Sequence, residues 1–371
     1  DEERGKASGE KIRMNTENKR NLSVDLAKTA ATFCVILIHV TGLSYDLTWQ
    51  GMADKPFVTR LVVLGCGVAG RLGVPIFMFL SGYLLLDRTY DRERTVSFWK
   101  NNLLRLLLAT EFWIIVYHFF SLWISKKPFR PDDLILDMAF YRTTDAVHLW
   151  YMGQILGLYL FIPVIARVLQ VILDKRTIVI LWVVSFCYIY IHTTVNVFRD
   201  VAQLPHLVPK FNVSFSGGCY GLMLVLGWMV KQGYFRRIRS WVFGMAFVES
   251  YGVLVALELY AYRHKITYNV WYDSGLLLVA AFCLMMLLIR IKRPVFPAFV
   301  RWAGQSGFGV YAIHYIFCMY LDGYLDRNYP LLASWQKGVV MLAAVIVLSN
   351  LSVWALSRIR PVGRVLFYMK R

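Results

Sequence analysis

Charged residues are scarce in this 371-residue sequence, at 17% of the total, whereas 58% of the residues are hydrophobic and 16% are aromatic. The mean hydropathy is +0.50. This composition excludes a soluble domain and indicates a polytopic membrane protein. Acidic residues are the scarcer charged class, with 23 Asp and Glu against 41 Lys and Arg. In so apolar a chain, the net charge of +18 predicts topology signals and contacts with lipid headgroups rather than binding of nucleic acid.

Several motifs are also lacking. The six cysteines lie singly in apolar segments, so the sequence predicts neither a disulfide framework nor a metal site. There is no glycine-rich phosphate loop, no Gly-x-Ser-x-Gly turn and no internal repeat. We interpret residues 1–13 as a cloning remnant ahead of a natural start at Met14, with no cleavable signal peptide after it. Residues 14–371 are then expected to form one transmembrane domain.

Ten apolar runs bounded by charge clusters predict the membrane spans. They cover residues 24–43, 61–86, 103–124, 147–169, 177–197, 213–230, 241–262, 270–289, 306–325 and 336–357. We therefore predict an all-α, polytopic integral membrane protein with about ten transmembrane helices. The segments at one set of alternating ends hold 22 Lys and Arg residues, and the opposite segments hold 12. By the positive-inside rule, both termini are expected to be cytoplasmic.

The first predicted span carries two basic residues on one face. His39 follows Lys28 by eleven residues. At about 100° per residue, this spacing is roughly 20° beyond three full turns, and the two Cα atoms should lie about 16 Å apart along the axis. Polar side chains are costly in lipid, so this face should point into the protein or a wet cavity. The structural alternative is that Lys28 reaches the membrane interface and His39 forms an interhelical hydrogen bond.

The second predicted span contains Arg71 among four glycines and a proline between residues 65 and 75. These residues argue against one straight helix, and the glycines allow close approach of neighbouring helices. A guanidinium in the middle of this span should face a wet cavity or an acidic partner. The alternative is that the span begins at Leu72, which places Arg71 at the interface.

The third predicted span begins near Arg105, one turn in from the cytoplasm, where extension of the side chain to the interface is the structural alternative to ligand binding. Within this span, Glu111 and His118 are seven residues apart and share a face. We predict that they form a buried structural pair. The loop over residues 125–146 is long enough for a short interfacial helix.

Two further histidines stand in or near later spans. An aromatic belt at the outer interface accounts for Trp150, but less readily for His148. Tyr311 and His314 lie inside the ninth predicted span, three residues apart.

Taken together, these stretches resemble the acyltransferase-3 family of integral membrane acyltransferases. The matching positions, in chain order, are Lys28 and His39, Arg71, the VPIFMFLSGY run over 74–83, the HLW run over 148–150 and the SGFGVYAIH run over 306–314. They occur in the expected order over nearly the whole chain. The chain departs from the family at its Arg-x-x-Arg motif, where Asn102 stands in the first position and Arg105 in the second. Lys28 also replaces the more common arginine of the first span.

The resemblance implies transfer of an acyl group, usually acetyl from acetyl-CoA, to a hydroxyl group. Acyl-CoA is then a co-substrate, and no bound cofactor or metal is expected. Lys28, Arg105 and Asn102 are the predicted donor-binding residues, because cations at the cytoplasmic entrance could hold the CoA phosphates. His39 is the predicted catalytic residue, since a histidine of near-neutral pKa can accept the hydroxyl proton. The candidate substrate-site residues are Arg71, Ser81, His148, Trp150, Tyr311 and His314.

Within the family, the chain is most similar to single-domain members that O-acetylate lipid-linked or surface glycans, such as those acting on enterobacterial common antigen. This implies a glycan or lipid-linked saccharide acceptor, contacts with membrane lipids and a location in a bacterial plasma (inner) membrane. Two alternatives remain open. The polar face of the first span could line the path of a transporter or flippase for a lipid-linked sugar. The protein could also be a structural subunit of an envelope synthesis complex.

Overall fold

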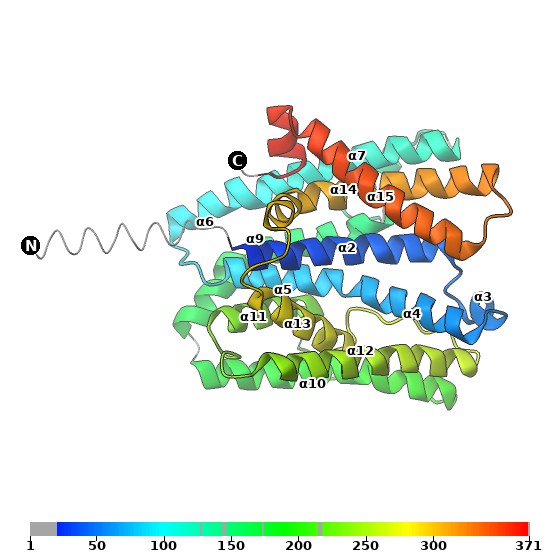
Figure 1. The fold of residues 1–371 in the computed structure, drawn as a ribbon. Helices are drawn as coiled ribbons and strands as arrows, with labels where there is room; N and C mark the ends of the chain where they lie inside the picture. Colours follow the sequence, from blue (N-terminus) through cyan, green and yellow to red (C-terminus); the bar gives the residue numbers. More distant parts are fainter. Residues whose placement is uncertain (1–20, 127, 143–145, 173, 214–216, 370–371) are drawn as a thin grey trace, which may run out of the picture.

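The computed structural model describes residues 21–369 except 127, 143–145, 173 and 214–216. Residues 1–13, interpreted above as a cloning remnant, lie outside the described residues. The regular elements of the described residues are helices, arranged as an elongated bundle (Figure 1). Seven of them are long and apolar enough to cross a membrane, and two shorter apolar helices accompany them. The protein is therefore an all-helical, polytopic membrane protein, as predicted.

A helix occupies each of the ten predicted spans. These are α2 (Leu22–Ser44), α4 (Phe57–Arg71) continued by α5 (Gly73–Leu85), α7 (Leu104–Ser125), α9 (Trp150–Arg167), α10 (Lys175–Val201), α11 (Gly218–Lys231), α12 (Ser240–Arg263), α13 (Gly275–Arg290), α14 (Pro297–Asn328) and α15 (Ser334–Leu356). The shorter elements are α3 (Trp49–Ala53), α6 (Arg92–Phe98), η1 (Trp99–Leu103), α8 (Pro131–Met138), η2 (Val147–Leu149), η3 (Val168–Ile172) and η5 (Val362–Leu366). The short helix expected in the loop over 125–146 is α8.

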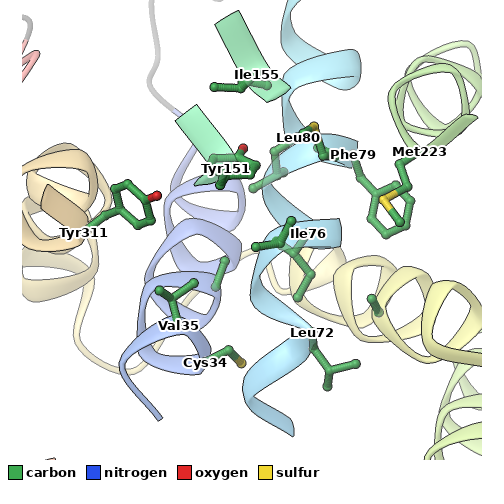
Figure 2. Packing of buried hydrophobic residues seen from close by; sticks show 14 of the residues in the cluster. Cys34, Val35, Leu72, Ile76, Phe79, Leu80, Tyr151, Ile155, Met223 and Tyr311 are labelled. Atoms are coloured by element: carbon green, nitrogen blue, oxygen red, sulfur yellow. The ribbon is translucent and has the colours of Figure 1, made fainter. Parts of the chain in front are cut away.

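Helix α2 runs through the middle of the bundle and packs against α4, α5, α13, α14 and α15. Its Val35 and the Ile76 side chain of α5 belong to one buried apolar core (Figure 2). Helix α2 begins, and α15 ends, at the same end of the bundle (Figure 1). Because Arg88, Arg105 and Arg290 lie at this end, we call it the basic end. By the positive-inside rule, this is the end predicted to face the cytoplasm.

The second predicted span is broken at Leu72 into α4 and α5, as its glycines and proline indicated. Helix α5 then crosses α11 at very close range. A Cβ atom on Gly82 would lie 1.8 Å from the Leu224 carbonyl oxygen, and one on Gly227 would lie 1.9 Å from the Phe79 carbonyl oxygen. Only glycine allows the two backbones to approach this closely.

The predicted pairing of Glu111 with His118 is wrong. The α7 face that carries His118 packs against α8, which places Asp137 Oδ2 3.6 Å from His118 Nδ1. Glu111 Oε2 is buried and has no hydrogen-bond partner in the part of the chain that the structure describes. Arg142 holds Asp137 through two hydrogen bonds of 2.9 and 3.2 Å. These bonds raise the pKa of Arg142. The residue that pairs with His118 therefore comes from α8 rather than from α7 itself.

Candidate functional site

Three histidines from distant parts of the chain meet in the interior of the bundle. His39 comes from α2, His148 from η2 and His314 from α14. Their ring centroids are 6.1 Å apart for His39 and His148, 5.4 Å for His39 and His314, and 5.1 Å for His148 and His314. The structure thus brings together three of the residues that the sequence singled out. Among the described residues, no group of three His, Cys, Asp or Glu side chains is placed to hold a metal ion.

Tyrosines and backbone carbonyls of α14 fix the geometry of this histidine cluster. The Tyr311 hydroxyl donates to the His148 carbonyl oxygen at 2.5 Å. His314 Nδ1 lies 2.7 Å from the Tyr311 carbonyl oxygen, which can only accept, so Nδ1 carries the proton and Nε2 keeps its lone pair. The Tyr117 hydroxyl of α7 donates to the Ala312 carbonyl oxygen at 2.7 Å. The cluster is therefore preorganised by hydrogen bonds from two helices.

The three imidazoles differ in exposure. His148 and His314 are 1% and 0% exposed, whereas His39 is only partly buried. Both ring nitrogens of His148, and Nε2 of His314, have no hydrogen-bond partner within the described residues. Because like charges repel strongly in an apolar interior, a proton on one imidazole disfavours a second proton on its neighbours. The three imidazoles therefore resist carrying protons together, because each charge would repel the next.

A cavity of about 330 Å³ lies between the histidine cluster and the basic end. Polar and charged lining residues are Lys28, Ser81, Arg88, Asn102 and Gln305, and aromatic ones are Phe77, Tyr151, Tyr159, Phe308, Tyr311 and Tyr368. The cations and amides thus share the cavity with apolar and aromatic walls. Such a combination suits a ligand that has an anionic end and an apolar end.

Tyr311 links the cavity to the histidine cluster. It lines the cavity, and its ring centroid is 5.3 Å from that of His148 and 6.0 Å from that of Tyr151. Figure 2 shows Tyr311 of α14 pointing towards Tyr151 of α9. None of the three histidines is itself among the residues that line the cavity. The histidine cluster therefore lies next to the cavity, on the far side of Tyr311.

The predicted donor-binding residues occupy different places. Lys28 and Asn102 line the cavity, as does Ser81, whose hydroxyl is 3.5 Å from that of Tyr159. Lys28 Nζ also lies 3.9 Å from Asp25 Oδ1. Arg105 does not line the cavity.

Arg105 instead contacts the C-terminal segment of the chain. Its Nη2 donates to the Arg364 carbonyl oxygen at 2.8 Å, and its Cζ is 5.2 Å from the Tyr368 ring centroid.

Arg71 and Trp150 belong to a separate aromatic cluster. Arg71 Cζ lies 4.6 Å from the centroid of the Trp271 ring, a cation–π geometry. Trp150 packs against the Trp271, Tyr272 and Tyr220 rings at 5.7, 5.2 and 6.0 Å. The Arg71 charge also interacts with the His39 ring. This aromatic cluster thus approaches the histidines separately from the cavity.

Several residues of the cavity were not predicted from the sequence, among them Arg88 and Tyr368. Arg88 follows the SGYLLLD run directly, and its position after a span suggested only a topology signal. Tyr368 lies far along the chain from every matched motif, so no local pattern marks it. Burial raises the pKa of the Tyr368 phenol, which keeps it neutral and able to donate a hydrogen bond.

Comparison with known proteins gives one family match. The model of the acyltransferase-3 family, described as an acyltransferase domain, matches residues 21–358. Neither the search of curated proteins nor that of solved structures gives a match. The matched region includes the histidine cluster and every cavity residue except Tyr368. The chain therefore belongs to the acyltransferase-3 family and is a multi-pass membrane acyltransferase.

Proposed function

We propose that this acyltransferase moves an acetyl or other short acyl group from cytoplasmic acyl-CoA to a hydroxyl of a lipid-linked or cell-surface glycan. The observation that carries the proposal is the position of the cavity, which extends from cations at the basic end to the tyrosines beside the histidine cluster. A bacterial plasma (inner) membrane fits this role. The acceptor class matches that of family members such as the O-acetyltransferases of enterobacterial common antigen.

The cavity is large enough for part of an acyl-CoA donor. Its volume of about 330 Å³ is near the lower limit of ligand pockets, which measure about 300–1,000 Å³. A pocket of this size takes the acyl and pantetheine part of a donor while the nucleotide stays at the mouth. Lys28 and Arg88 then bind the phosphates, because cation–phosphate hydrogen bonds are among the stronger ones in proteins. Asn102 supplies an amide beside them.

His39 is the general base in this proposal. The acceptor oxygen attacks the thioester carbonyl carbon, and His39 takes the hydroxyl proton as the new C–O bond forms. The C–S bond then breaks, and the CoA sulfur takes a proton from the imidazolium. His39 suits this role because it is the least buried of the three histidines and shares α2 with Lys28 of the cavity. His148 and His314, whose rings pack against that of His39, would orient it.

The acceptor would approach from the other side of the histidine cluster. Trp150 and its aromatic neighbours present flat faces, and Arg71 adds a cation whose charge acts on His39. Aromatic faces and a fixed charge are suited to binding a saccharide and positioning its hydroxyl. Ser81 and Tyr311, which line the cavity, would contact the acyl group where it meets the acceptor hydroxyl.

Incubation of the purified protein with labelled acetyl-CoA, with and without a panel of glycan acceptors, tests the proposal. We expect label in one acceptor class, together with release of free CoA. Slow hydrolysis of the thioester is expected without acceptor. If neither transfer nor hydrolysis occurs, the proposed reaction is wrong. Transport of a lipid-linked sugar, or a structural role in an envelope complex, would then explain the buried polar residues.

A further inference from the structure

The C-terminal segment of the chain folds back onto the basic end of the bundle. After α15, residues 358–369 include η5 and end beside α7 and η1. Phe367 is 1% exposed, and its ring is stacked on that of Trp113 at a centroid distance of 6.0 Å. Trp113 Nε1 donates to the Leu366 carbonyl oxygen at 3.1 Å. The segment is therefore anchored by packing and by a hydrogen bond to α7.

The anchored segment delivers Tyr368 to the donor cavity. Tyr368 lines the cavity together with Lys28, Arg88 and Asn102. Its hydroxyl donates to the Asn102 carbonyl oxygen at 3.4 Å, and its ring centroid is 6.0 Å from that of Phe308. One wall of the cavity thus comes from a segment that lies beyond residue 358, where the family match ends.

Arg105 adds a second hydrogen bond between this segment and the third predicted span, beside that of Trp113. Its guanidinium donates to the Arg364 backbone and lies against the Tyr368 ring, without lining the cavity. A cation–π contact of this kind restrains the ring that it faces. Loss of Arg105 would therefore let the Tyr368 ring turn away from the cavity, while Phe367 and Trp113 still hold the segment on α7.

We infer that Tyr368 is a donor-binding residue that packs against the nucleotide end of acyl-CoA, and that Arg105 acts as its positioning residue. The inference rests on the proposed function and adds to it. Tyr368 is assigned to the nucleotide end of the donor because it lines the cavity near the cations that would bind the phosphates. The acyl end would lie towards Tyr311. Arg105 then affects donor binding through Tyr368 instead of contacting a phosphate.

Binding measurements on the purified full-length protein test this inference. The probes are acetyl-CoA, adenosine 3′,5′-bisphosphate as the nucleotide part, and acetyl-pantetheine, which lacks the nucleotide. Loss of an aromatic ring that packs against a base weakens binding by about tenfold or more. We therefore expect Tyr368→Ala to weaken the binding of acetyl-CoA and of the bisphosphate by about tenfold. The affinity for acetyl-pantetheine should be unchanged. Tyr368→Phe, which keeps the ring, should bind all three nearly as the wild type does.

Arg105→Ala should reproduce the selective loss of Tyr368→Ala. The double variant Arg105→Ala/Tyr368→Ala should lose no more affinity for acetyl-CoA or the bisphosphate than either single variant does, because both changes remove the same contact. Tyr368→Leu, which keeps apolar bulk but lacks the ring, serves where Tyr368→Ala fails to fold. The control is Tyr141→Ala, since Tyr141 is 86% exposed and lies after α8, away from the basic end.

Three results separate the possibilities. Unchanged nucleotide affinity in Tyr368→Leu would overturn the role of Tyr368. Additive losses in the double variant would show that Arg105 contacts the donor independently, and would overturn its positioning role. If the wild type binds none of the three probes, the proposed function fails first, and with it this inference.

Discussion

Lys28 and Arg88 reach the same cavity from different parts of the chain. Lys28 comes from the second turn of α2, whereas Arg88 follows α5 and donates through Nε to the Leu84 carbonyl oxygen. The first was predicted from its face on the helix. The second resembled an ordinary interfacial arginine, because nothing in its local sequence distinguishes a cation that enters a cavity from one that meets lipid headgroups.

Removal of either cation should weaken donor binding. A hydrogen bond to a charged group contributes about 1.5–3 kcal/mol, so Lys28→Ala and Arg88→Ala should each raise the dissociation constant for acetyl-CoA by about tenfold or more. Lys55→Ala, at an exposed position near the opposite end, is the control. Because Lys28 lies 3.9 Å from the buried Asp25, thermal unfolding should be recorded alongside. Unchanged affinity in both variants would mean that Lys28 and Arg88 do not bind the donor and act only as topology signals.

At the scale of helices, the crossing of α5 and α11 is set by two glycines. A methyl group at Gly82 has no room, because the Leu224 backbone lies where the new carbon would be. A Cβ atom added to Gly67, in α4, would have no neighbouring atom within 4 Å. The two sites therefore separate close helix packing from the general effect of glycine on a helix.

Gly82→Ala should push α5 and α11 apart and lower the free energy of unfolding by about 1–3 kcal/mol, the usual cost of overpacking. Gly67→Ala, as the matched control, should be neutral or stabilise by up to about 1 kcal/mol, because alanine favours helix more than glycine does. Thermal unfolding in detergent measures both. Equal unfolding temperatures for the two variants would mean that the backbones do not touch as the structure indicates.

Helix faces were predictable from periodicity, but the elements that cover those faces were not. The eleven-residue spacing placed Lys28 and His39 on one face of α2, and the structure sets Lys28 in the cavity and His39 in the histidine cluster. The same reasoning paired Glu111 with His118 incorrectly, because it could not know that α8 brings Asp137 to the face of α7. Likewise, the ring that Arg71 faces, Trp271, comes from a distant loop that the pattern of the second span could not indicate.

For the whole molecule, the motifs along the chain singled out the three histidines but not their arrangement in space. His39, His148 and His314 sit on three different elements, so only the packed bundle shows that they meet. Tyr368 was beyond prediction, because its place depends on the return of the C-terminal segment to α7. Long-range contacts of this kind leave no periodic pattern in the sequence.

The orientation of the bundle is testable with reporter fusions. The asymmetry of basic residues predicts that the basic end faces the cytoplasm. A reporter fused after Lys126 should therefore report the outside, and one fused after Arg237 should report the inside. The same location for both fusions would contradict the predicted topology and the cytoplasmic donor site.

The measurement that tests the central claim most directly is made on His39→Gln, with donor binding and acyl transfer followed in the same preparation. Glutamine keeps a polar side chain of similar size but cannot accept the proton. Removal of a general base typically costs about 10²–10⁴-fold in rate. We therefore predict a loss of transfer of that size, with acetyl-CoA affinity within about twofold of the wild type.

His264→Gln, at an exposed histidine near the opposite end, should retain full transfer and is the matched control. Loss of transfer with intact donor binding in His39→Gln alone would support a donor cavity that leads to a basic histidine in the bundle interior. Normal turnover by His39→Gln would contradict the account, and the base would then have to be His148 or His314.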